Sequence, residues 1–129
     1  MLRKLLGATL SLSLVWSSAA SADQALLVFG GKGHDVFLGC LNCDKYAGNS
    51  IQNSYGPYGS KYSETSILNR YSDYGSKYSD TGACNEYAND APVIVDNAGN
   101  YYGKLSLNKY GGQTRNSDIV AWLTAVCSD

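Results

Sequence analysis

The chain has few residues suited to catalysis. It contains a single histidine, His34, which stands beside Asp35 in a glycine-rich stretch. No serine or cysteine carries a recognisable nucleophile motif, and the acids are scattered singly rather than marked as a glycosidase pair. Because catalysis needs a titratable group beside a partner of matched pKa, the sequence predicts a protein that is not an enzyme. A small secreted hydrolase that uses His34 is the enzymatic alternative.

The chain also lacks an excess of charge of either sign. Its Lys and Arg residues number 10 and its Asp and Glu residues 11, which gives a formal net charge of −1. A nucleic-acid partner would require a clustered basic face, so none is expected. The loop Asp96-Asn97-Ala98-Gly99-Asn100 offers oxygen ligands but lacks the twelve-residue calcium pattern, and no phosphate-binding glycine loop precedes a helix. The sequence therefore predicts no cofactor.

Only the N-terminus carries a long apolar run. Residues 5–16 follow the basic pair Arg3 and Lys4 and precede the small residues Ala20-Ser21-Ala22. This order predicts a signal peptide over residues 1–22, with cleavage before Asp23. The run is too short to cross a bilayer of about 30 Å, so no membrane span is expected in the mature chain. We expect one domain over residues 23–129 that is periplasmic or secreted. Cleavage removes Arg3 and Lys4 and so lowers the formal charge from −1 to −3. The sequence leaves the oligomeric state open.

Four cysteines belong to the mature chain: Cys40, Cys43, Cys84 and Cys127. An even number of cysteines in a short exported chain predicts two disulfides. A zinc site is the alternative, because Cys40 and Cys43 have the CxxC spacing of metal ligands, although a second CxxC is missing. Sequence allows three pairings. We favour those that join the CxxC segment to Cys84 and Cys127, because longer closed loops restrict the unfolded chain more.

A sixteen-residue motif occurs twice in the middle of the chain, at residues 50–65 and 66–81, and a truncated third copy begins at Ala83. Residues 47–90 contain seven tyrosines but only three large aliphatic side chains. The recurring Asn-x-Tyr predicts a turn, since an asparagine side chain can bond the backbone two residues ahead. We expect residues 47–90 to form a turn-rich wrap over the hairpins, in which each Asn-x-Tyr is one clamp and glycines permit the reversals that let successive rings stack on a common surface. Disorder is the alternative, because tracts of Ser, Gly, Tyr and Asn can stay flexible.

Two similar segments flank the repeats. Residues 25–46 and 92–110 each contain two short strand-like runs joined by Gly or Asn turns, which predicts two β-hairpins. Alternation places Phe37, Gly39, Leu41 and Cys43 on one side, matched by Tyr101, Gly103, Leu105 and Leu107, and we expect that side to be the core. Gly39 and Gly103 should allow another backbone or a ring to approach closely.

The C-terminal segment 116–127 predicts one helix. Asn116 or Ser117 can cap it, and four apolar residues recur at helical spacing: Ile119, Trp122, Leu123 and Val126. The expected fold is therefore a small, mainly β domain. It has two hairpins forming a compact sheet, Tyr/Gly repeats wrapped on it, one C-terminal helix and disulfide staples.

The repeat wording resembles a family of uncharacterised exported bacterial proteins. The resemblance rests on the run Asn-x-Tyr-Gly-x-Tyr-Gly-Ser-x-Tyr-Ser between two Leu-Gly-x-Leu-like strands, and it covers residues 27–110. This chain departs from the family pattern where Ser72-Asp73 replaces the Gly-Pro seen at Gly56-Pro57. The resemblance implies a bacterial, extracytoplasmic setting, and it carries no established activity and no functional residues.

Regularly spaced tyrosines favour a binding function. Aromatic rings with a polar hydroxyl suit sugar faces, and tyrosine is also enriched at protein interfaces. We therefore expect a non-enzymatic structural or binding domain that contacts cell-envelope glycan or protein. The candidate contact residues are Tyr58, Tyr62, Tyr74 and Tyr78.

Overall fold

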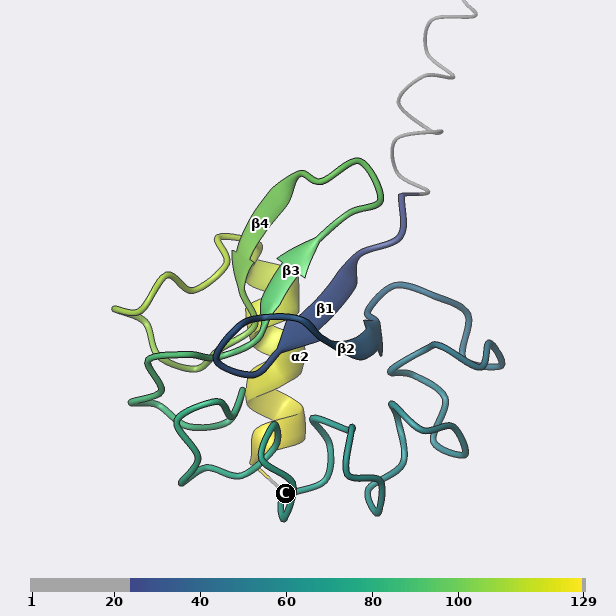
Figure 1. Cartoon of the computed structure of the whole chain (residues 1–129), viewed down its shortest axis with the longest axis horizontal. Helices are drawn as coiled ribbons and strands as arrows, with labels where there is room; N and C mark the ends of the chain where they lie inside the picture. The colour runs from purple at the N-terminus through teal and green to yellow at the C-terminus, as the bar shows by residue number, and fades with distance from the viewer. Residues whose placement is uncertain (1–23, 129) are drawn as a thin grey trace, which may run out of the picture.

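The protein is described by a computed structural model over residues 24–128, and the expected signal peptide lies outside these residues. Four strands form one antiparallel sheet in the order β2-β1-β3-β4 (Figure 1). They are β1 (Leu27–Gly30), β2 (Val36–Cys40), β3 (Val93–Val95) and β4 (Tyr101–Lys104), followed by the helix α2 (Ser117–Cys127). The predicted fold class, two hairpins in one sheet with a C-terminal helix and two disulfides, is confirmed.

The two hairpins join through their first strands. Val28 of β1 pairs with Ile94 of β3, and both side chains are fully buried. The outer strands also have backbone partners on their far sides. Isolated parallel β-bridges join Cys40 to Ser50 and Lys104 to Gln113. Both edges are therefore partly covered by neighbouring chain, which limits edge-to-edge association.

The core side that alternation predicted for the first hairpin is only partly right, since Gly39 and Leu41 are buried but the face of β2 at Leu38 and Cys40 is buried as well. Leu38 and Cys40 are fully buried, whereas Phe37 is only half-buried. In the second hairpin, Tyr101 was expected in the core and is 59% exposed, whereas Leu105 of the same predicted set is fully buried. Gly39 and Gly103 have positive φ angles of 109° and 96°, which interrupt the regular pleat on which the prediction depended.

The same glycines do permit close approach, as expected. A Cβ on Gly39 would lie 2.7 Å from the Cβ of Tyr58 and 2.8 Å from a side-chain carbon of Ile51. A Cβ on Gly103 would lie 2.7 Å from the Cα of Thr114. Since no real Cβ tolerates such distances, these positions require glycine twice over, for φ and for space.

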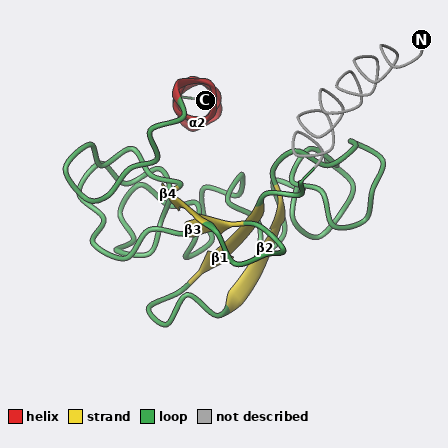
Figure 2. Cartoon of the chain, turned by 90° about the horizontal axis from the view of Figure 1, so that it is seen from above, coloured by secondary structure: helices red, strands yellow, loops and turns green. Residues whose placement is uncertain are grey.

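Helix α2 begins where the sequence predicted. Asn116 is its N-cap, and its side-chain oxygen accepts the N–H groups of Asp118 and Ile119 at 3.0 and 3.2 Å. The helix lies on one side of the sheet, as the view from above shows (Figure 2). Leu123 is its one buried residue and belongs to the same core cluster as Val28 and Ile94. An eleven-residue helix is marginal alone, so this packing holds it in place.

The cysteines form two disulfides, but not in the favoured pairing. Cys40 bonds Cys43, and Cys84 bonds Cys127 across a sequence separation of 43. The prediction that the CxxC segment joins the other two cysteines is therefore wrong. The chain bends directly after β2 and brings the Cα atoms of Cys40 and Cys43 to 5.6 Å, a normal disulfide distance. Since all four thiols are used, none is left to bind zinc.

Residues 44–88 form a continuous series of β-turns, here called the turn array, which fans out beside the sheet (Figure 1). Nearly every third N–H donates to the carbonyl three residues earlier, as in Asn69 N to Ser66 O and Ser72 N to Asn69 O. Small or polar residues occupy the shared corners, and the two residues between corners form the tips. Ile51, Ile67 and Ala83, which recur every sixteen residues, are buried and anchor the array in the core.

The glycines of the array serve packing rather than reversal. Gly59 and Gly75 do not have positive φ. Instead, a Cβ on Gly59 would lie 2.1 Å from the carbonyl oxygen of Asn53, and one on Gly75 would lie 2.2 Å from that of Asn69. Adjacent turns therefore pack backbone against backbone, which only glycine allows.

Candidate functional site

Asparagine side chains hold the Asn-x-Tyr turns as predicted. In each, the Oδ1 atom accepts the N–H of the tyrosine two residues later, at 2.9 to 3.0 Å, and Nδ2 donates to a more distant carbonyl. The four asparagines are Asn53, Asn69, Asn85 and Asn108. One side chain thus fixes its own turn and ties that turn to an earlier part of the chain.

Serine performs the first of these roles in the Ser-Lys-Tyr turns. Ser60 Oγ accepts the N–H of Tyr62, and Ser76 Oγ accepts that of Tyr78, both at 3.1 Å. The backbone that carries each of these rings is therefore fixed locally, without any contact from the ring itself.

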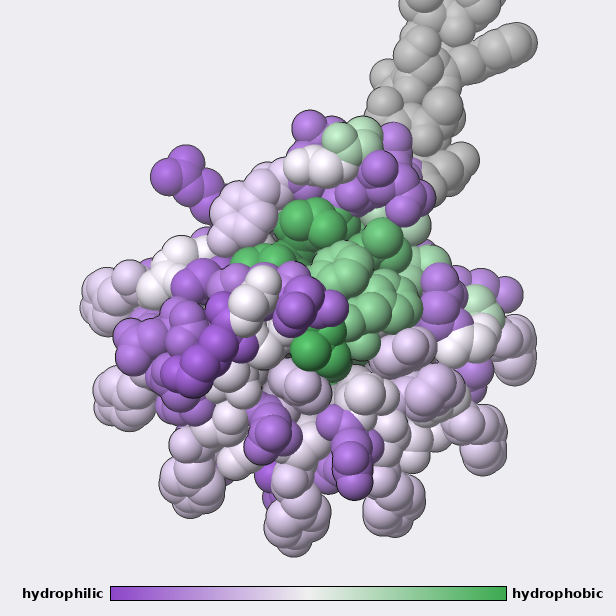
Figure 3. Space-filling view, viewed as in Figure 1, coloured by the Kyte–Doolittle hydropathy of each residue, from purple (hydrophilic) through white to green (hydrophobic). Residues whose placement is uncertain are grey.

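Seven tyrosines at the turn tips are 80–97% exposed. We call them the tyrosine rim: Tyr46, Tyr55, Tyr62, Tyr71, Tyr78, Tyr87 and Tyr110. Each is the third residue of its turn, which places it at the tip, away from the corners. Side chains project outward along the border of the molecule beside the turn array (Figure 3). Burial within the molecule explains none of these rings.

The four candidate tyrosines divide into two pairs. Tyr62 and Tyr78 belong to the rim. Tyr58 and Tyr74 are half-buried and pack against the core cluster, and the Tyr58 ring lies edge-on to Phe37 at 5.0 Å between ring centroids. Tyr58 and Tyr74 therefore contribute to packing, and only the first pair is placed for contact with a ligand.

The prediction missed the other five rim tyrosines. It treated each Asn-x-Tyr as a clamp that lays its ring on the domain, whereas the clamp fixes the turn and leaves the ring outside. One signal was present in the sequence: Lys or Arg precedes five of the seven rim tyrosines, at Lys45, Lys61, Arg70, Lys77 and Lys109. The half-buried Tyr58 and Tyr74 follow Pro57 and Asp73 instead.

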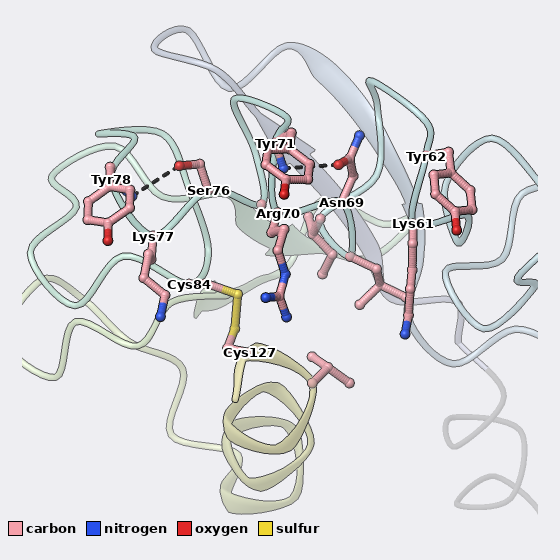
Figure 4. A pocket seen from close by; sticks show the side chains of 14 residues that line it. Lys61, Tyr62, Asn69, Arg70, Tyr71, Ser76, Lys77, Tyr78, Cys84 and Cys127 are labelled. Carbon is pink, nitrogen blue, oxygen red and sulfur yellow. Dashed lines mark hydrogen bonds between the residues drawn. A yellow bond between two sulfur atoms is a disulfide. The ribbon is translucent and has the colours of Figure 1, made fainter. Parts of the chain in front are cut away.

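Three of these basic–tyrosine tips line one groove of about 880 Å³, here called the basic groove (Figure 4). The tips are Lys61-Tyr62, Arg70-Tyr71 and Lys77-Tyr78. The disulfide between Cys84 and Cys127 and the end of α2 close the opposite side. Among the described residues, the lining includes no Asp or Glu.

A second, more open depression lies beside the second hairpin. It is lined by Lys109, Tyr110, Arg115 and residues of β4 and α2, including Tyr101 and Tyr102. Basic and tyrosine side chains therefore occur together here as well.

Tyr102 is tied to Asp96, the residue considered for calcium. The Asp96 carboxylate accepts the Tyr102 hydroxyl at 2.6 Å, the Asn100 side chain at 3.0 Å and the N–H groups of Ala98 and Asn100. These bonds, the Tyr102 hydroxyl first, lower the pKa of Asp96 to about 2, and the same contact raises the pKa of Tyr102. The carboxylate is thus engaged in holding the β3–β4 hairpin.

His34 also has a hydrogen-bond partner, which lies far away in the sequence. Its Nε2 atom donates to the Ala91 carbonyl at 3.2 Å, and its φ of 52° places it in the turn between β1 and β2. This contact links the first hairpin to the segment before β3. Within residues 24–128, no group of three or more His, Cys, Asp or Glu side chains could hold a metal ion.

One face of the sheet carries apolar side chains that the helix does not cover. Leu27, Phe29, Val93 and Val95 alternate with the buried residues of β1 and β3 and are half-buried. A group of apolar side chains is visible at the centre of the face in Figure 3, and α2 lies behind the sheet in that view. These apolar residues belong to the sheet and are not part of the tyrosine rim.

Comparisons of the chain with protein-family models, with curated proteins and with solved structures give no match. The resemblance to exported bacterial proteins therefore stays a prediction, and the function has to be argued from the geometry alone.

Proposed function

We propose that this chain is an exported, non-enzymatic binding domain that contacts cell-envelope glycan through the tyrosine rim. The observation that carries the proposal is the rim itself: seven tyrosines are 80–97% exposed on turns that other side chains hold in place. Because the backbone beneath each ring is already ordered, binding would have to fix only the side-chain rotamers, which lowers its entropic cost.

Tyrosine suits a glycan better than a purely apolar ligand. The ring offers a flat apolar face to a sugar, and the hydroxyl keeps contact with water or with sugar hydroxyl groups. Among residues 24–128, the largely exposed large apolar side chains are all tyrosines. A membrane surface would favour aliphatic or tryptophan side chains at such positions, and Trp122, the tryptophan within residues 24–128, is half-buried.

The two disulfides support an extracytoplasmic setting, since such bonds persist in oxidising compartments. None of the helices in the described part of the chain is long and apolar enough to cross a membrane. The proposed export depends further on the signal peptide expected at residues 1–22.

Co-sedimentation with purified peptidoglycan sacculi tests the proposal. We expect the oxidised protein to sediment with the sacculi and the Tyr62→Ala/Tyr78→Ala variant to bind about tenfold more weakly, because alanine removes the stacking face. Both side chains are exposed, so neither substitution should alter stability by more than about 0.5 kcal/mol.

The matched control is Tyr62→Phe/Tyr78→Phe, which keeps the rings and removes only the hydroxyls. It should bind within about threefold of the wild type. Equal binding by the wild type and the alanine variant would remove the role of these rings.

A further inference from the structure

The three cations of the basic groove have no structural partner in the described part of the chain. There, the ion pairs within 4.0 Å all involve Lys32, which contacts Asp80 and Asp90. Lys61, Arg70 and Lys77 instead extend from three separate turns toward the space beside the Cys84–Cys127 disulfide (Figure 4). Folding therefore brings three like charges to one concave surface without neutralising them.

This local charge is opposite to that of the whole chain, whose net charge is −1. A concave surface of one sign focuses the electric field and attracts ions of the other sign. The end of α2 opposes this field, because the last carbonyls of a helix carry roughly half a negative charge. Ser128 partly offsets that charge, since its N–H and its hydroxyl both donate to the Ala125 carbonyl. The side chains of Lys61, Arg70 and Lys77 carry three full positive charges, against about half a negative charge from the helix end.

Each cation is also adjacent in sequence to a rim tyrosine. The repeat places the same pair twice, at Lys61-Tyr62 and Lys77-Tyr78, sixteen residues apart, and each pair follows a serine that bonds the tyrosine N–H. Arg70-Tyr71 lies between them on an asparagine turn. The groove thus presents one combination of ring and charge several times, which fits a ligand with a repeating unit.

We propose that the basic groove binds a linear anionic polysaccharide. Its sugar rings stack on Tyr62, Tyr71 and Tyr78, while its carboxylate or phosphate groups pair with Lys61, Arg70 and Lys77. This inference rests on the proposed glycan-binding function and adds the charge of the ligand to it. A groove of about 880 Å³ has room for a short stretch of such a chain.

Binding titrations of the oxidised domain with four polymers distinguish the contribution of the ligand's charge from that of its sugar rings. Dextran is neutral, dextran phosphate and polygalacturonate carry phosphate and carboxylate groups on sugars, and polyglutamate carries carboxylates without sugars. We expect at least one charged glycan to bind about tenfold or more tightly than dextran, and also more tightly than polyglutamate. The better of the two charged glycans identifies the acidic group. Raising the salt concentration fourfold should weaken that binding by roughly 20- to 40-fold, because three neutralised ligand charges give a slope of about −2 to −2.7 in a plot of log affinity against log salt concentration.

Two triple variants locate the site. Lys61→Gln/Arg70→Gln/Lys77→Gln removes the groove cations and should abolish the preference for charged glycan over dextran. Lys45→Gln/Lys109→Gln/Arg115→Gln is the control, because it also removes two lysines and one arginine but none that lines the basic groove. It should keep the preference within about threefold. Far-ultraviolet circular dichroism and urea unfolding confirm that both variants fold, which is expected because all six side chains are on the surface.

Several outcomes overturn this inference. Equal affinity for dextran and both charged glycans would do so and leave the proposed function standing. An equal loss in both triple variants would show that net charge, or the depression lined by Lys109 and Arg115, contributes as much to binding as the groove does. Polyglutamate binding as tightly as the glycans would indicate an acidic protein partner. Absence of binding to every glycan, together with absence of binding to sacculi, would remove both proposals.

Discussion

Asn69 is the most buried of the asparagines that hold the turn array, at 7% exposed, and it tests the structural logic of the array. Its Oδ1 atom accepts the Tyr71 N–H at 3.0 Å, and its Nδ2 atom donates to the Ser63 carbonyl at 2.9 Å. The Asn69→Ala substitution removes both bonds. Each net hydrogen bond contributes about 0.5–1.5 kcal/mol, so we expect a loss of about 1–3 kcal/mol in the free energy of unfolding.

Two further substitutions at Asn69 separate the two bonds. Asn69→Ser should retain the first, because Ser66 already makes that bond to the N–H of Leu68 at 3.0 Å, and it should lose the second. Its stability should therefore lie between those of the alanine variant and the wild type. Asn69→Asp keeps the acceptor but turns a carboxylate oxygen toward the Ser63 carbonyl, so at neutral pH it should be no more stable than the alanine variant.

Equilibrium urea unfolding under non-reducing conditions measures these differences, and an unchanged m-value confirms that the comparison is valid. Asn97→Ala, at an exposed position in the β3–β4 turn, is the control and should stay within about 0.5 kcal/mol of the wild type. The reasoning would be refuted by an Asn69→Ala variant as stable as this control, or by a fully stable Asn69→Asp variant.

Two other predictions concern the disulfides and the β3–β4 hairpin. Replacing Cys84 and Cys127 by alanine should lower the free energy of unfolding by about 4 kcal/mol, measured with urea, because their disulfide has a sequence separation of 43. Replacing Cys40 and Cys43 should lower it by about 1.5 kcal/mol, because that disulfide closes a loop with a sequence separation of only 3. Equal losses in the two variants would contradict this order. The pKa of Asp96 is lowered from 3.8 to about 2 in the folded protein, chiefly by the Tyr102 hydroxyl, so its ionised form stabilises the fold above about pH 4 and this contribution is lost as the pH falls toward 2. The stability advantage of the wild type over Asp96→Asn should therefore shrink on acidification, and an advantage that does not change between about pH 5 and pH 2.5 would show that Asp96 is not linked to folding.

The sequence predicted features that depend on short-range chemistry. The cap at Asn116 and the bonds from Asn53 or Asn69 to the tyrosine N–H two residues ahead follow from the reach of one side chain. The two hairpins followed from turn residues between short apolar runs. Such contacts involve residues within a few positions of each other, so a single sequence contains the information.

Features that depend on the global path of the chain were not predictable. The core face of β2 is set by the positive φ of Gly39, which no alternation rule includes. The disulfide pairing is set by a bend that brings Cys40 beside Cys43, while the argument from loop length considered only the unfolded chain. The basic groove brings together turns from two repeats and the end of α2, so its existence depended on how the array closes around the helix.

The turn array separates the residues that fold the domain from those available to a ligand. Corners and inward tips, such as Ser66, Ile67 and Gly75, are buried and constrained by hydrogen bonds or by backbone contact. Outward tips such as Lys77-Tyr78 touch little of the domain, because their geometry comes from the Ser76 hydroxyl at the preceding corner. Substitution at an outward tip therefore changes the chemistry of the surface with little effect on the fold. A repeat of this kind can present the same basic and aromatic pair several times, and the spacing of those pairs is fixed by backbone that the ligand never contacts.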